Sequence, residues 1–175
     1  MKKIYLTILL VLVLFYSSLV AQVVFTSDFE SWTENIPNSW NGSQTTIETD
    51  SIVPYTSSVH GGTKACRLIN RETTMKTFST IPIYLERGAT YNISWWMRGK
   101  ANCRLIMYTG TNATLAVWSN NSYEWAFHNV KYTATENQSA EIVFTATATK
   151  LTHDDLQIDD VTITFDHENK NLDIN

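Results

Sequence analysis

The chain lacks the residue patterns that mark several common classes of protein. It has only two cysteines, Cys66 and Cys103, and no CxxC pair, so a cysteine zinc site is excluded. Whether the two thiols form a disulfide or stay free is open from the sequence. Lysine and arginine total 13 against 17 aspartate and glutamate, which gives a net charge of −4. This balance lacks the basic excess of a nucleic-acid-binding domain, and we expect no nucleic-acid partner.

Catalytic motifs are also scarce. The sequence contains neither a GxSxG elbow nor an HExxH pair. Residues 153–155 read His-Asp-Asp and could orient a base, yet no nucleophile motif accompanies them. Glu124, Glu136 and Glu141 could form a glycosidase pair, but the sequence does not give their separation. We therefore expect a protein that is not an enzyme.

Long apolar runs are limited to one, Ile4 to Tyr16, which follows Lys2 and Lys3. The run is short for a membrane span, which needs about 20 residues. It fits a signal peptide over residues 1–21, cleaved after Ala21, with an uncleaved anchor as the alternative. We expect the mature protein to be secreted, extracellular or periplasmic, or at the cell surface, and free of the membrane.

The chain is rich in aromatic residues and in short alternating segments. Hydrophobic residues make up 43% of it, with six Trp, eight Tyr and seven Phe, enough apolar surface for one folded domain. Segments of period two are separated by Asn, Gly, Ser, Thr and Pro, as in an all-β sandwich or barrel. This pattern predicts a β domain over residues 22–166, followed by a polar tail over 167–175.

The strongest alternation covers Thr90 to Arg98, where one strand face is apolar and the other carries Trp96 and Arg98. On the next predicted strand, Arg104 and Tyr108 have the corresponding parity. A face of tryptophan, tyrosine and arginine suits a sugar, because apolar ring faces stack on aromatics and hydroxyl groups accept hydrogen bonds. These four residues form a candidate glycan-binding face. The alternative is an ordinary strand aromatic covered by a loop.

The other tryptophans are less informative. Trp118 stands beside an Asn-Asn loop and could line the rim of a binding cleft or cap the core. Trp125 alternates with Phe127, which favours a place in the core. Trp32 and Trp40 lie in an irregular stretch, where aromatics usually hold a loop in place.

The last strand changes its alternation partway. Leu156 and Ile158 place the apolar face on even positions, whereas Val161 and the residues after it place it on odd positions. Such a change needs one extra residue, so we predict a β-bulge at Asp159–Asp160. One carboxylate would then turn inward and require a partner or a metal ion. The acidic segment Asp28–Glu30 near the start of the domain offers matching groups.

Several sequence motifs occur along the chain in a recognisable order. They are Asp28-Phe29-Glu30, the distant Trp40, His60-Gly61-Gly62 entering a strand, Leu85 to Arg98, Trp125, and the closing Ile158-Asp159-Asp160-Val161. The order resembles that of jelly-roll carbohydrate-binding modules of the family 4/9/22 type, within the galactose-binding-like sandwiches. The resemblance implies a jelly roll of two antiparallel sheets and non-catalytic binding of a polysaccharide or other glycan. Gly61 and Cys66 depart from the Ser and Leu usual in that family.

The resemblance also implies a structural calcium that joins the two ends of the domain. Glu30 and Asp160 would be its side-chain ligands, with Asp159 as the alternative and a carbonyl near Thr63 or Lys64 completing the shell. Calcium accepts six to eight oxygen ligands in flexible geometry. The competing interpretation is that the two aspartates simply face solvent at the end of a strand.

Two functions follow from the sequence. The first is an exported, calcium-stabilised module that binds a glycan through Trp96, Arg98, Arg104 and Tyr108, with Trp118 at the rim. The second is an extracellular or cell-surface module that recognises protein or serves assembly and has no sugar site. A concave aromatic groove favours the first, and a flat or covered face favours the second.

Overall fold

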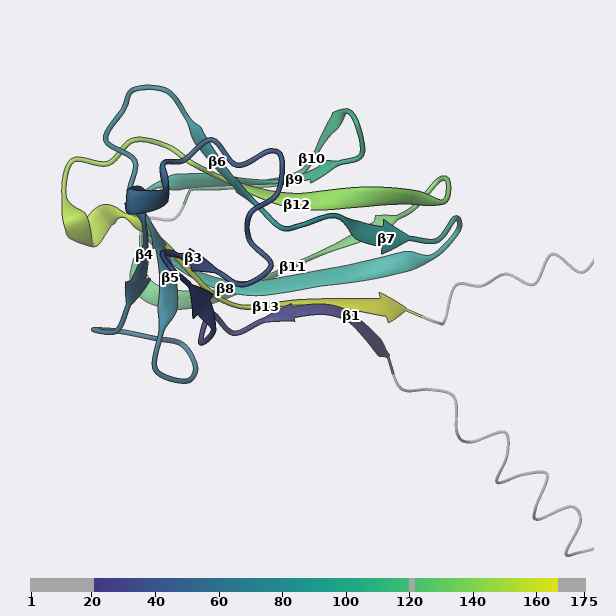
Figure 1. Cartoon of the computed structure of the whole chain (residues 1–175), viewed down its shortest axis with the longest axis horizontal. Coiled ribbons are helices and arrows are strands. Elements are labelled where there is room, and N and C mark those ends of the chain that lie inside the picture. Colours follow the sequence, from purple (N-terminus) through teal and green to yellow (C-terminus); the bar gives the residue numbers. More distant parts are fainter. Residues whose placement is uncertain (1–20, 120–121, 167–175) are drawn as a thin grey trace, which may run out of the picture.

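Two antiparallel sheets packed face to face form the body of the protein. The computed structural model describes residues 21–119 and 122–166. Figure 1 shows one layer containing β6, β9 and β12 above a second layer containing β8, β13 and β1. The six-stranded sheet runs β11-β8-β13-β5-β4 with β1 beside β13, and the five-stranded sheet runs β10-β9-β12-β6 with β7 beside β12. The predicted jelly-roll β-sandwich is confirmed.

The strand bounds agree with the alternating segments of the sequence. The six-stranded sheet consists of β1 (Gln22–Ser27), β4 (Ile52–Tyr55), β5 (Ala65–Leu68), β8 (Thr90–Gly99), β11 (Ser122–Thr133) and β13 (Leu156–Asp166). The five-stranded sheet consists of β6 (Lys76–Ser79), β7 (Ile83–Leu85), β9 (Asn102–Tyr108), β10 (Asn112–Ser119) and β12 (Gln138–Ala146). A small hairpin pairs β2 (Trp32–Thr33) with β3 (Ile36–Pro37), and short 3₁₀ turns cover Thr49–Ser51 and Thr152–Asp154.

The core lies between the two sheets. On β8 the inward residues are almost fully buried, with Ile93, Trp95 and Met97 at 0% exposure. Trp40 is also at 0% exposure and stacks on Phe78 with ring centroids 4.7 Å apart. Trp40 therefore anchors the irregular N-terminal stretch to the core. Cys66 and Cys103 are buried free thiols, and burial raises the pKa of Cys103 to about 12.

The chain changes sheets between β8 and β9. The corner begins at Gly99, whose φ is +108°, and a Cβ there would lie 2.1 Å from the carbonyl oxygen of Asp155. The amides of Lys100 and Ala101 both donate to the carbonyl of Asp154, at 2.9 and 3.1 Å. β9 therefore belongs to the opposite sheet, and the expected single face shared by the two strands does not exist.

The predicted bulge in β13 is confirmed. The register between β13 and β8 shifts between Asp159 and Thr162, and Asp160 has a φ of 47°, a left-handed conformation that aspartate tolerates. Before the bulge β13 pairs with β5, and after it β13 pairs with β1. The bulge is thus the place where the last strand changes neighbours.

Two segments differ from what their composition indicates. Residues 52–62 contain Pro54 and the Gly61-Gly62 pair, which favour a loop, but β4 occupies the first part of this segment as the last strand of its sheet. An edge strand tolerates Pro54 because one side of its backbone carries no ladder partner. Thr45–Glu48 is rich in the β-branched residues that favour a strand, yet it is irregular.

Several expectations fall outside this description. The expected signal peptide, apart from Ala21, and the expected polar tail lie outside the described residues. Within residues 21–119 and 122–166, no helix has the length and apolar character needed to cross a bilayer.

Candidate functional site

Aromatic side chains gather on the outer face of the six-stranded sheet. Trp96 of β8 and Phe127 of β11 are directly paired across the strands, with ring centroids 5.4 Å apart. His60, from the loop between β4 and β5, stacks on Trp96 at 3.7 Å with an interplanar angle of 15°. Trp125 meets the His60 ring edge-on at 6.3 Å. We call Trp96, Trp125, Phe127 and His60 the aromatic patch.

The position of Trp125 corrects the interpretation that placed it in the core. The inward positions of β11 are opposite inward residues of β8 and are held by Ala126, His128, Val130 and Tyr132. Phe127 is 51% exposed, and Trp125 contacts the outward-facing Arg98, whose guanidinium carbon lies 5.9 Å from the Trp125 ring centroid. The two largest apolar side chains of β11 therefore face outward.

A polar row crosses the same face next to the aromatic patch. Gln157 of β13 pairs with Arg98 of β8 on one side and with Arg67 of β5 on the other. Residues directly opposite one another on neighbouring strands project to the same side of the sheet. We call Arg67, Gln157 and Arg98 the polar row. The row lies among aromatic rings, because the guanidinium carbon of Arg67 is 5.3 Å from the Tyr55 ring centroid.

Several polar atoms of this face are buried without a hydrogen-bond partner. Gln157 is at 0% exposure, and neither its amide nitrogen nor its amide oxygen has a partner. The Nε atoms of Arg67 and Arg98 and the indole nitrogen of Trp125 are in the same state. Buried polar groups are nearly always paired in folded proteins. These atoms are the hydrogen-bonding groups that the described residues of this face leave unsatisfied.

The other two predicted sugar contacts lie on the opposite side of the sandwich. Arg104 is exposed and Tyr108 partly buried, both on β9 of the five-stranded sheet. The structure therefore brings Trp96 and Arg98 together and separates them from Arg104 and Tyr108. The cause is the change of sheet after Gly99, which parity along the chain does not reveal. The backbone of Trp118 pairs with Cys103, and its side chain lies outside the described part of the structure.

The outer face of the five-stranded sheet contains a buried carboxylate with every oxygen occupied. Glu141 of β12 is 4% exposed. It accepts from the amide and hydroxyl of Ser43 at 3.0 and 2.6 Å, the amide of Gln44 at 3.1 Å and the hydroxyl of Ser79 at 2.8 Å. Burial raises the pKa of Glu141, but these bonds outweigh it and leave the pKa below its ordinary value. This carboxylate holds the segment after Trp40 onto the sheet.

The acidic residues of the two chain ends meet at one loop. Glu30 accepts from the amides of Thr63 and Lys64 at 2.6 and 2.8 Å and from the Thr63 hydroxyl at 2.6 Å. Asp159 accepts from the amides of His60 and Gly61 at 2.9 and 3.2 Å. Residues 60–64 are therefore held by the first acidic segment and by the last strand together.

The two aspartates of the bulge have different environments. Asp159 is at 0% exposure, and burial raises its pKa to about 6 although three backbone amides favour the ionised form. Asp160 is partly exposed, and its Oδ2 lies 2.6 Å from Nδ1 of His60. Asp159 is buried but does not point into the core as the parity change predicted, because it pairs with outward-facing Trp96 and lies under the loop at His60 and Gly61. Asp160 is the carboxylate left partly exposed at the surface.

Oxygen ligands for a cation are present at this junction. A Cβ on Gly61 would lie 2.8 Å from Oδ2 of Asp160, and one on Gly62 would lie 2.2 Å from Oε1 of Glu30. The two carboxylates therefore flank a turn that has no side chains of its own. Among the described residues, no group of three or more His, Cys, Asp or Glu side chains is placed to hold a metal ion. A calcium here would depend on two carboxylates and backbone carbonyls.

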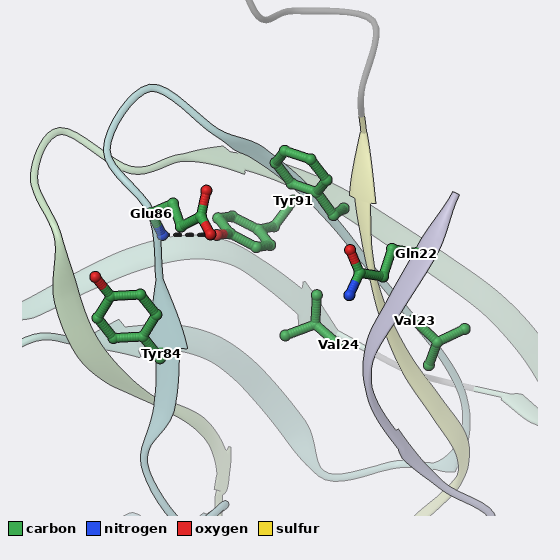
Figure 2. A pocket seen from close by; sticks show the side chains of 7 residues that line it. Gln22, Val23, Val24, Tyr84, Glu86 and Tyr91 are labelled. Atoms are coloured by element: carbon green, nitrogen blue, oxygen red, sulfur yellow. Dashed lines mark hydrogen bonds between the residues drawn. The ribbon is translucent and has the colours of Figure 1, made fainter. Parts of the chain in front are cut away.

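A separate hollow of about 280 Å³ opens at the other end of β8. Figure 2 shows Gln22, Val23 and Val24 of β1 on one side of it and Tyr84 and Glu86 on the other. The amide of Glu86 donates to the Tyr91 hydroxyl at 2.7 Å across its floor (Figure 2). Because Tyr91 begins β8 and Trp96 lies further along it, this hollow does not belong to the aromatic patch.

Within the His-Asp-Asp segment 153–155, which has no accompanying nucleophile motif, Asp155 is part of the scaffold. Asp155 is at 0% exposure and forms an ion pair with Arg71. It also accepts from the Thr149 hydroxyl at 2.5 Å. These contacts hold the turn before β13.

A comparison with protein-family models gives the family of the chain. The model described as "Carbohydrate binding domain", of the CBM 4/9 type, matches residues 21–164. The chain belongs to this family of carbohydrate-binding domains. The match to this family model confirms the expected resemblance, and the family is one of sugar-binding rather than catalytic modules. A search of curated proteins finds no match.

Solved structures of carbohydrate-binding modules share the fold. The CBM22-1 xylan-binding domain of Paenibacillus barcinonensis Xyn10C is 12% identical, with a TM-score of 0.65, covering 86% of this chain and 98% of that one. The CBM22-1 and GH10 modules of Clostridium thermocellum xylanase 10B, complexed with xylohexaose, are 19% identical with a TM-score of 0.62, covering 83% and 29%. TmCBM61 in complex with β-1,4-galactotriose is 16% identical with a TM-score of 0.52, covering 78% and 89%. At these identities the likeness establishes the fold alone.

Of the three residues in the polar row, the sequence predicted only Arg98 as a binding residue. A usable signal exists, because Arg67 stands between inward-facing Cys66 and Leu68, and Gln157 between inward-facing Leu156 and Ile158. Alternation therefore places both outward. It does not show that the strands β5, β13 and β8 are neighbours.

Proposed function

We propose that this protein is an exported, non-catalytic module that binds a glycan on the outer face of its six-stranded sheet. The observation that carries the proposal is the aromatic patch beside a row of buried polar atoms without partners. Aromatic rings offer stacking surfaces to the apolar faces of sugar rings, and the unpaired donors and acceptors suit hydroxyl groups. Membership of the carbohydrate-binding family supports the same function.

The opposite face is a weaker candidate. Its buried carboxylate, Glu141, already accepts four hydrogen bonds from the protein. A ligand that used Glu141 would have to break contacts that hold the segment after Trp40. Arg104 and Tyr108 remain accessible there, but the structure shows no unpaired buried polar group beside them among the described residues.

The proposal is tested by removing an exposed aromatic ring from each sheet in turn. Phe127→Ala removes the most exposed ring of the aromatic patch, and Tyr84→Ala removes a ring that is 59% exposed on β7 of the other sheet. Xylan is the first polysaccharide to try in affinity electrophoresis, because solved relatives are xylan-binding domains. We expect Phe127→Ala to weaken glycan binding about tenfold, the size of one lost stacking contact.

Tyr84→Ala is the matched control and should bind like the parent protein. Both variants should melt near the parent temperature, since neither ring is in the core. Equal binding by Phe127→Ala and the parent would move the sugar site away from the aromatic patch. Absence of binding to any neutral or acidic polysaccharide would favour the alternative of a protein-interaction module.

We further propose a structural calcium at the junction of the two chain ends. Glu30 and Asp160 would be its side-chain ligands, with the carbonyl of Thr63 as a further oxygen. Asp159 is less suited, because its carboxylate is completely buried, whereas Glu30 and Asp160 are partly exposed. The proposal is supported by hard oxygen ligands that flank a glycine turn and by three carboxylates around it that a cation would stabilise.

Thermal melting with calcium and with a chelator tests this site. A ligand at 100 times its Kd stabilises the folded state by about 2.7 kcal/mol. We therefore expect calcium to raise the melting temperature by about 5 °C relative to EDTA, and Glu30→Gln to remove the difference. Magnesium is the control, since it prefers a smaller octahedral shell. Identical melting in calcium and EDTA would contradict a calcium site.

A further inference from the structure

The polar row places two positive charges around one buried amide. Arg67, Gln157 and Arg98 are in register on three adjacent strands, so the two arginines stand two strand spacings apart, about 10 Å. Neither arginine takes part in an ion pair with another described residue. In a chain of net charge −4, these two guanidinium groups lie on a face that also carries stacking surfaces, and the carboxylate on that face, Asp159, accepts from backbone amides and not from either arginine.

The hydrogen-bonding state of the row specifies the missing group. Both arginine Nε–H groups and the Gln157 amide nitrogen are buried donors without acceptors, while only the Gln157 oxygen is an acceptor without a donor. Most of the unpaired groups in the row are therefore donors that lack an acceptor, and two of these donors belong to cationic guanidinium groups. A carboxylate provides two acceptor oxygens and a negative charge, and it matches the planar guanidinium fork.

We propose that the glycan recognised on this face is acidic and that the carboxylate of a uronic acid residue binds between Arg67 and Arg98, over Gln157. The inference rests on the proposed glycan-binding function and adds the chemical class of the sugar. The carboxylate accepts from both guanidinium groups and from the Gln157 amide nitrogen. Neighbouring sugar rings lie against Phe127 and Trp125 on one side and Tyr55 on the other.

Ser58 currently supplies the one side-chain acceptor of the row. The Arg98 guanidinium donates to its hydroxyl, which reaches over from the loop between β4 and β5. A carboxylate is a stronger acceptor for a guanidinium than a hydroxyl is. The uronate therefore displaces the Ser58 hydroxyl from Arg98, and its contact with the Gln157 amide, which is at 0% exposure, requires the side chains that cover Gln157 to move aside.

The experiment compares each acidic polysaccharide with its own carboxyl-reduced form. Polygalacturonate, glucuronoxylan and alginate are used, and reduction of the carboxylate to a primary alcohol keeps the linkage and the ring faces. Binding of the full chain is measured by affinity electrophoresis and by calorimetry on oligosaccharides. At least one acidic form should bind about tenfold or more tightly than its reduced form, the contribution expected of a charge-assisted pair.

Two variants assign that preference to the row. Arg67→Gln and Arg98→Gln should each abolish the difference between the acidic and the reduced form, so that both forms bind the variant with the same affinity. Arg104→Gln, an exposed arginine on the other sheet, is the matched control and should keep the difference. Ser58→Ala, which removes the competing hydroxyl, should bind the acidic form as tightly as the parent protein or more tightly.

The possible outcomes distinguish a failure of the uronate site from a failure of the proposed glycan-binding function. Equal binding of acidic and reduced forms, weakened alike by Phe127→Ala, would overturn the uronate site and leave the glycan-binding face intact. Binding of dextran sulfate as tight as that of the best uronate would reduce the site to unspecific charge attraction. Absence of binding to every acidic and reduced polysaccharide would overturn the proposed function itself.

Discussion

Both sheets bury polar side chains at outward-facing positions, among them Glu141 in the five-stranded sheet and Gln157 in the six-stranded sheet. Glu141 accepts four hydrogen bonds from the protein, whereas both polar atoms of the Gln157 side chain have none. Both side chains are almost completely excluded from solvent. The two side chains are thus buried to a similar degree but differ in how many hydrogen bonds they receive from the protein.

The difference separates a structural role from a binding role. A buried carboxylate with every acceptor position occupied stabilises the fold and offers nothing to a ligand. A buried amide without partners costs stability and remains available to a ligand that can supply them. Three tests sharpen this contrast, from the largest expected effect to the smallest.

Glu141→Gln tests the structural side of the contrast. The substitution removes the charge and places an amide N–H₂ against the two donors of one carboxylate oxygen, so two charge-assisted bonds are lost. Such bonds contribute about 1.5–3 kcal/mol each, and we expect the free energy of unfolding to fall by about 3 kcal/mol. Denaturant unfolding at neutral pH measures this change.

The pH dependence provides the control for the Glu141 test. Because the folded pKa of Glu141 is lowered, its stabilisation is present above the unfolded pKa and is lost as the pH falls through the folded value. The gap in stability between the parent and Glu141→Gln should therefore shrink in acid. A constant gap from neutral pH down to strong acid would show that the carboxylate charge is not what holds Ser43 and Gln44.

Gln157→Leu tests the binding side and should act in the opposite direction. The substitution removes two unpaired polar atoms and keeps most of the side-chain volume, so we expect unfolding free energy to rise by about 1 kcal/mol. Affinity for a uronate-containing glycan should fall in the same variant. A loss of stability comparable to that of Glu141→Gln would mean that the Gln157 amide has partners in solution and serves the fold.

The double variant Arg104→Ala with Tyr108→Ala should have the smallest effect on binding. Both residues lie on the five-stranded sheet, away from the aromatic patch. We expect glycan affinity to change by less than about 0.5 kcal/mol, the usual range for residues outside a site. Loss of binding in this variant, with Phe127→Ala unaffected, would reverse the assignment of the two faces.

The candidate site shows where local reasoning succeeds and where it stops. The alternation along Thr90–Arg98 correctly places Trp96 and Arg98 outside the core, because side-chain direction follows from strand geometry within one segment. The same reasoning joins them to Arg104 and Tyr108, which is wrong, because the turn at Gly99 carries the chain to the other sheet. Trp125 was assigned to the core for a similar reason, since alternation gives two faces without saying which is inner.

The sequence by itself determined that this chain forms an all-β domain and that its last strand breaks register at Asp159–Asp160. Both conclusions depend on the period of two along single strands, which is a property of neighbouring residues. Only the tertiary structure decided that positions 67, 98 and 157 form one row and that His60 covers Trp96. These neighbours come from strand order and register, which are fixed by packing between segments far apart in the chain.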